Sequence, residues 1–159
     1  MQISHRKRYT LVSEPKGATY TRLVEHCSSY SSSASLIVRN GLGISDRGQR
    51  LLDSLGPSVI SSERRSEWPG TVLLSGDALV VTIQLDGSAV DALRLGADRL
   101  FGWIQPDLPE DLSFIRTDGS PFLVTICHES DAYLEADEFE VSQFKQQFPN
   151  VPLLEGTDL

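Results

Sequence analysis

The clearest helical pattern in the chain lies in residues 18–30. Tyr20 is followed by apolar residues three, four, seven and ten positions later. This spacing puts all of them on one face of an α-helix. The segment therefore predicts an amphipathic helix that packs its apolar face against a core. The residues of this face are Tyr20, Leu23, Val24, Cys27 and Tyr30.

Two more helices are predicted in the middle of the chain. One begins at Ser45, whose hydroxyl suits an N-cap, and stops at Gly56. The other begins at Ser88 and ends before Pro106, because proline cannot continue a helix. The second helix carries a long apolar stripe at three- and four-residue steps. Its members are Val90, Leu93, Ala97, Leu100, Phe101 and Ile104.

A last helix is expected after residue 130. Phe139, Phe144 and Phe148 are its expected anchors in the core, and Pro149 stops it. We expect residues 150–159 to cap this helix at first and to fray at their end.

The strongest strand signal is a hairpin around Asp118–Gly119, a dipeptide that favours a two-residue turn with positive φ at both positions. Such a turn pairs Ile115 with Phe122 and Phe114 with Leu123. Both faces of the hairpin are then apolar, so we expect it to be central in its sheet and covered on both sides.

Other apolar runs predict the remaining strands. They include residues 6–13, residues 35–39 and a strand through Val59 that continues into an arginine-rich stretch. Residues 71–86 read as two strands joined at the turn residues 75–77. Strands and helices alternate irregularly, and the 159-residue length suits one compact domain. The prediction is a single α+β domain, residues 1–159, with a mainly antiparallel sheet and three to four helices.

Composition points to a cytoplasmic protein without a membrane span. No apolar run approaches the roughly 20 residues that a membrane helix needs. The basic cluster at residues 5–8 is not followed by an apolar stretch, so no secretory signal is expected. Cys27 and Cys127 form no disulfide framework, which favours reduced thiols.

Charge is distributed unevenly along the chain. The net charge is −8, yet residues 1–104 hold 12 Lys or Arg against 10 Asp or Glu, a net of +2. Residues 105–159 hold 2 against 12, a net of −10. Such a field repels nucleic acid and anionic membranes and steers a basic protein partner. A solvated acidic region that only keeps the protein soluble is the alternative.

The run Cys127–Glu129 is the best candidate for chemistry. On a continuing strand, Cys127 and His128 would point to opposite faces and could not act on one atom. The acidic surroundings also favour a protonated thiol, so Cys127 is expected to be a core residue. Adjacent ligands chelate poorly, so neither a metal nor another cofactor is predicted. His128 with a nearby carboxylate remains a candidate for a general base.

The residues predicted to bind a partner form two groups. The first is an acidic set spread over several elements, although Asp137 and Glu138 would equally suit the start of a helix. The second is Trp68 with two arginines, typical interface anchors, for which a salt-bridge patch around a buried tryptophan is the alternative. The sets are Asp107, Glu110, Asp111, Glu129, Asp131, Glu135, Asp137 and Glu138, and Arg64, Arg65 and Trp68.

The sequence therefore predicts a small acidic binding protein that neutralises or regulates a basic protein partner. Bacterial immunity proteins and antitoxins that inhibit basic nucleases share this composition, which is an analogy rather than a motif match. The alternatives are a small hydrolase that uses His128 and a non-catalytic subunit of a larger assembly. The oligomeric state stays open.

Overall fold

An antiparallel sheet of eight strands dominates the computed structural model, which describes residues 5–158. The strand order is β10-β1-β9-β8-β7-β2-β6-β3. The strands are β1 (Lys7–Leu11), β2 (Ser33–Arg39), β3 (Val59–Arg65), β6 (Ala78–Gln84), β7 (Glu110–Ile115), β8 (Pro121–Ile126), β9 (Asp131–Ala136) and β10 (Leu153–Asp158). The predicted hairpin, β7 and β8, lies near the centre of this order, as expected.

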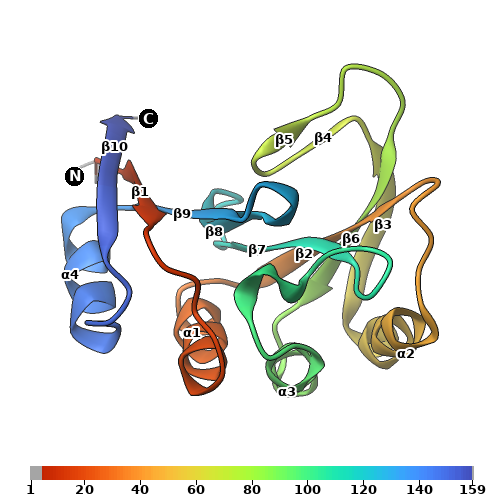
Figure 1. The fold of residues 1–159 in the computed structure, drawn as a ribbon, viewed down its shortest axis with the longest axis horizontal. Coiled ribbons are helices and arrows are strands. Elements are labelled where there is room, and N and C mark those ends of the chain that lie inside the picture. The colour runs from red at the N-terminus through yellow and green to blue at the C-terminus, as the bar shows by residue number, and fades with distance from the viewer. Residues whose placement is uncertain (1–4, 159) are drawn as a thin grey trace.

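Helices cover one face of the sheet (Figure 1). They are α1 (Ala18–Ser29), α2 (Asp46–Leu55), α3 (Gly87–Gly96) and α4 (Glu138–Gln147). A short pair of strands, β4 (Glu67–Trp68) and β5 (Thr71–Val72), stands on the opposite face. The protein is thus a single α+β domain, as predicted. Within the described residues, no helix is both long and apolar enough to cross a membrane.

The α1 helix shows how the sequence pattern builds the core. Tyr20, Leu23, Val24 and Cys27 are all fully buried against the sheet and its neighbours. The Tyr20 hydroxyl donates to the Leu93 carbonyl oxygen at 2.6 Å and accepts from the indole of Trp103 at 3.0 Å. These bonds satisfy the polar ends of two buried aromatic rings, so both can remain in the core without an unpaired polar group.

Two helix predictions needed correction. The α3 helix starts after the N-cap Asp86 rather than at Ser88, and it ends at Gly96 instead of reaching Ile104. A Cβ on Gly96 would lie 3.0 Å from a methyl carbon of Leu51, so α2 packs closely there. The chain then turns through a separate 3-10 segment, Leu100–Gly102.

The last helix is shorter than predicted. Residues 131–136 form β9, and α4 begins only after Asp137, which closes a capping box with Glu140. Phe144 and Phe148 are buried as expected, but Phe139 is 65% exposed and is no anchor. The tail is not a frayed cap, because Leu153–Asp158 forms β10 beside β1, while Leu159 lies outside the described residues.

Two hairpin predictions also changed. In the β7–β8 turn only Gly119 has positive φ, and Ile115 pairs with Pro121 instead of Phe122, whereas the predicted Phe114–Leu123 pair forms. The two strands predicted within residues 71–86 do not pair with each other. β5 pairs with β4, and β6 lies between β2 and β3 in the main sheet.

Candidate functional site

An arm, residues 66–77, projects from the helix-free face of the sheet (Figure 1). Pro69 and Gly70 form its turn, with Trp68 opposite Thr71 and a φ of 86° at Gly70. Proline followed by glycine suits such a turn, so this dipeptide was a readable sequence signal. A Cβ on Gly70 would approach a methyl carbon of Val124 to 2.8 Å, which shows how closely the arm packs on β8.

Trp68 fixes the base of the arm. The residue is 6% exposed and packs with Ile37, Ala78 and Val80 from β2 and β6. The guanidinium of Arg39 lies 5.1 Å from the ring centroid, a cation–π contact. The structure thus buries most of Trp68, as expected for the alternative in which the tryptophan plugs the edge of the core.

Asp111 sits beneath Trp68 in an unusual backbone conformation. Its φ is 55°, in the left-handed region that non-glycine residues seldom adopt. The β2–β7 register shows one extra residue on β7 here, since Ser35 pairs with Ser113 and Ile37 with Glu110. A bulge of this kind redirects side chains and is frequent beside functional sites. Asp111 accepts from Trp68 Nε1 at 3.1 Å and from the Cys127 backbone N–H at 2.9 Å.

Glu110, the neighbour of Asp111, meets His128 and Arg39. His128 Nε2 lies 2.6 Å from Glu110 Oε2, and Arg39 Nε lies 3.4 Å from the same oxygen. The Glu110 side chain is fully buried, whereas that of His128 is 38% exposed. The strand ends at Ile126 and residues 127–129 form a 3-10 turn, so the strand does not continue through Cys127 and His128 and the alternation argument does not apply to them.

The His128–Glu110 pair has the geometry of a histidine oriented by a carboxylate, which is one requirement for a general base. The nearby thiol does not complete a nucleophilic site. Burial raises the pKa of Cys127 to about 12, so the thiol stays protonated at neutral pH. Among residues 5–158, no group of His, Cys, Asp and Glu side chains is arranged to hold a metal ion.

Most carboxylates of the predicted acidic set interact with other groups of the protein itself. Glu110 and Asp111 are buried, so in this structure they face side chains of the protein itself rather than a partner. Asp107 pairs with Arg47 at 2.6 Å and Glu135 with Arg8 at 3.4 Å. Asp137 caps α4. Glu129, Asp131 and Glu138 make no ion pair within the described part of the chain.

The three unpaired carboxylates lie in two places. Asp131 begins β9 and lines a groove together with residues of the arm, Glu129 lies two residues before it, and Glu138 follows the other end of β9. At a rise of about 3.3 Å per residue, the five steps from the first to the last residue of β9 separate its two ends by about 17 Å. Only Glu129 and Asp131 therefore belong to the candidate site.

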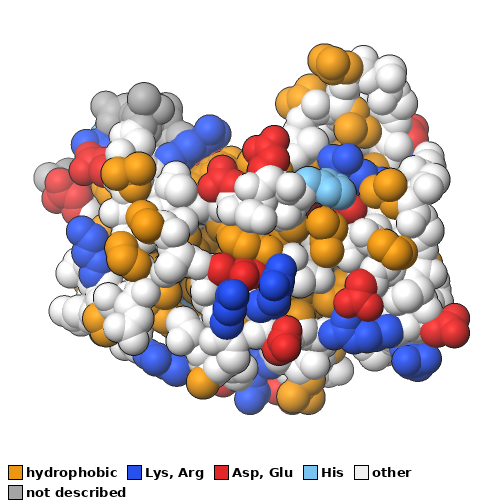
Figure 2. All heavy atoms as spheres, in the orientation of Figure 1, with side chains coloured by type: hydrophobic (Ala, Val, Ile, Leu, Met, Phe, Trp, Pro, Cys, Tyr) orange, Lys and Arg blue, Asp and Glu red, His pale blue; other side chains and the backbone are white. Residues whose placement is uncertain are grey.

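A groove of about 520 Å³ runs between the arm and the neighbouring strands. Figure 2 shows the molecule hollowed at this point, with acidic side chains near the bottom of the hollow. The arm supplies Trp68, Gly70, Thr71 and Val72, and the sheet supplies Arg8, Thr10, Ile126, Asp131, Tyr133 and Gly156.

Arg64 and Arg65 lie on the edge strand β3, away from this groove in strand order. Arg64 pairs with Asp77 at 2.8 Å and Arg65 with Glu63 at 2.8 Å. Both side chains are half exposed. Charged side chains on an edge strand discourage pairing with the sheets of other molecules. This role explains Arg64 and Arg65 without a contact to a protein partner.

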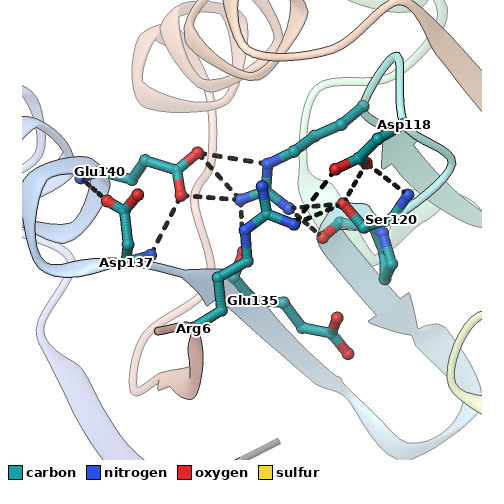
Figure 3. A network of polar contacts seen from close by, with 8 residues as sticks. Arg6, Asp118, Ser120, Glu135, Asp137 and Glu140 are labelled. Atoms are coloured by element: carbon teal, nitrogen blue, oxygen red, sulfur yellow. Dashed lines mark hydrogen bonds and ion pairs between the residues drawn. The ribbon is translucent and has the colours of Figure 1, made fainter. Parts of the chain in front are cut away.

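A second polar network, around Arg116, is structural (Figure 3). Arg116 is 8% exposed and donates to both oxygens of Glu140 at 2.9 Å. It also donates to the carbonyl oxygens of Pro121 and Glu135, each at 2.6 Å. Arg116 and Glu140 are paired with each other inside the protein, so these contacts join the end of β7 to β8, β9 and α4. Nothing in the sequence singled out this arginine.

Comparison of the chain with models of known protein families, with curated proteins and with solved structures gave no significant match.

Proposed function

We propose that this protein binds a basic protein partner through the helix-free face of its sheet and thereby neutralises or regulates it, as an immunity protein or antitoxin does. The observation that carries the proposal is the arm. It holds two exposed apolar side chains, Val72 and Leu74, and Val72 lines the same groove as the carboxylate of Asp131. Apolar anchors combined with charge suit a protein interface more than a small-molecule pocket.

The acidic C-terminal third supports a basic partner. Although many of its carboxylates are paired, the protein keeps a net charge of −8, and its field favours cationic surfaces. Complementary charge acts mainly on the association rate, and added salt screens it.

The test begins with affinity capture from the native host and identification of the co-purifying protein. With that partner purified, binding is measured between about 50 and about 500 mM NaCl, over which we expect the association rate to fall at least tenfold. Glu129→Gln should slow association, while Glu138→Gln, which removes the same charge at the far end of β9, should not. A neutral or acidic partner, or salt-independent association, would contradict the proposal.

A second candidate, a hydrolase, is favoured by the 2.6 Å contact between His128 and Glu110. It ranks lower because His128 does not line the groove and the Cys127 thiol is not activated. Purified protein is assayed against generic ester, phosphodiester and glycoside substrates, and His128→Gln is compared with the wild type. An activity that survives this substitution removes the histidine from the reaction.

A further inference from the structure

Two charged side chains line the groove beside the arm, Arg8 and Asp131. Arg8 interacts with neighbouring side chains of the protein, whereas Asp131 has no such partner among the described residues. The Arg8 guanidinium lies 4.8 Å from the centroid of the Tyr133 ring and 3.4 Å from a Glu135 carboxylate oxygen. Asp131, by contrast, makes neither an ion pair nor a side-chain hydrogen bond with any residue in the described part of the chain. The groove therefore carries one carboxylate whose charge is not neutralised by a neighbour.

The walls of the groove suit a long aliphatic stem. Val72 and Trp68 line it from the arm, and Ile126 lines it from β8. An arginine or lysine side chain buries its methylene groups along such apolar walls while its charged end meets a carboxylate. Burial also raises the pKa of the Tyr133 hydroxyl, which keeps this group a neutral hydrogen-bonding partner in the same groove.

We propose that the groove is the subsite for one basic side chain of the partner, whose cationic end pairs with Asp131 and whose stem lies between Val72 and Ile126. This inference rests on the proposed function and names what its site recognises. Charge complementarity selects the occupant, because Arg8 is already paired and Asp131 is left to meet a cation. The 520 Å³ volume accommodates a side chain together with its flanking backbone.

The test needs no knowledge of the partner. The capped peptide Ac-Gly-Arg-Gly-NH₂ is titrated into ¹⁵N-labelled protein and amide shifts are followed by NMR. The controls are the isosteric citrulline peptide and the lysine peptide. We expect saturable shifts confined to residues 68–72 and 126–133 with the arginine and lysine peptides, and at least tenfold weaker binding of the citrulline peptide.

Asp131→Asn should lower the affinity for the arginine peptide at least tenfold, while Glu138→Gln should leave that affinity unchanged. Thermal melts check that both variants fold. Absence of shifts in the groove, equal binding of citrulline, or an unaffected Asp131→Asn variant would each overturn the inference. These outcomes differ from a failure of the proposed function. A basic partner that still binds Asp131→Asn with full affinity leaves the function standing and removes only the subsite.

Discussion

The indole Nε1 of Trp68 donates a 3.1 Å hydrogen bond to Asp111 Oδ2, and this bond ties the arm to the central strand β7. Both groups are buried. The bond thus joins a surface element with exposed apolar side chains to the most enclosed part of the sheet. An arm held in this way would lose little conformational entropy on binding a partner, which favours affinity.

The first prediction concerns this bond. Trp68→Phe keeps an aromatic ring but removes the indole N–H, so a buried carboxylate oxygen of Asp111 loses its donor. The unfolding free energy should fall by about 1–3 kcal/mol in urea denaturation. Glu67→Gln, an exposed change on the same strand of the arm, should shift it by less than about 0.5 kcal/mol. Equal stability of the two variants would show that the bond contributes nothing.

The second prediction concerns acid stability. The hydrogen bond from the Ser120 hydroxyl, with help from Arg6, lowers the pKa of Asp118 from 3.8 to about 2. A carboxyl group whose pKa is lower in the folded state than in the unfolded state stabilises the fold. This stabilisation is complete above the pKa of the unfolded state and disappears as the pH falls toward the pKa of the folded state. The stability difference between wild type and Asp118→Asn should therefore shrink as the pH is lowered from about 5 to about 2.

Ser120→Ala provides the control for Asp118, because it removes the largest cause of the lowered pKa while leaving the carboxylate in place. Its own dependence on acid should be weaker than that of the wild type. If the difference in stability between the wild type and Asp118→Asn stays constant across this pH range, the lowered pKa of Asp118 is contradicted.

The third prediction concerns the thiols. Burial raises the pKa of Cys127 to about 12 and raises that of the fully buried Cys27 as well. Because the thiolate is the reacting species, iodoacetamide at about pH 8 should label both cysteines at least 100-fold more slowly in the native protein than in urea. Mass spectrometry of digested samples distinguishes the two sites. Rapid native labelling of Cys127 alone would restore it as a candidate nucleophile.

Elements with a long apolar pattern could be predicted from the sequence, and elements without one could not. The α1 helix was predictable because its apolar spacing extends over the whole element. β9 was not, since its leucine, glutamate and alanine residues favour helices in isolation. Pairing with β8 on one side and β1 on the other makes it a strand. This is a tertiary effect that no local pattern contains.

The candidate site was only partly visible in the sequence. The acidic set included Asp131, which lines the groove beside the arm, and the exposed Glu129 two residues before it. It could not separate them from Glu110 and Asp111, which a bulge turns toward Trp68, Arg39 and His128. A charge count treats exposed and buried carboxylates alike, whereas their chemistry depends on partners that lie far away in the sequence.

The last prediction concerns the arm as a contact element. Leu74 is fully exposed on the arm, and Leu95 is similarly exposed at the end of α3, on the helix side of the sheet. Because neither side chain is buried in the isolated protein, Leu74→Ser and Leu95→Ser should each change the unfolding free energy by less than about 0.5 kcal/mol. With the captured partner, Leu74→Ser should weaken binding by about 1–2 kcal/mol and mainly raise the dissociation rate, whereas Leu95→Ser should have no effect.

Surface plasmon resonance with the wild type and both variants measures these binding and dissociation constants directly. Equal effects of the two substitutions would show that the partner binds elsewhere on the molecule.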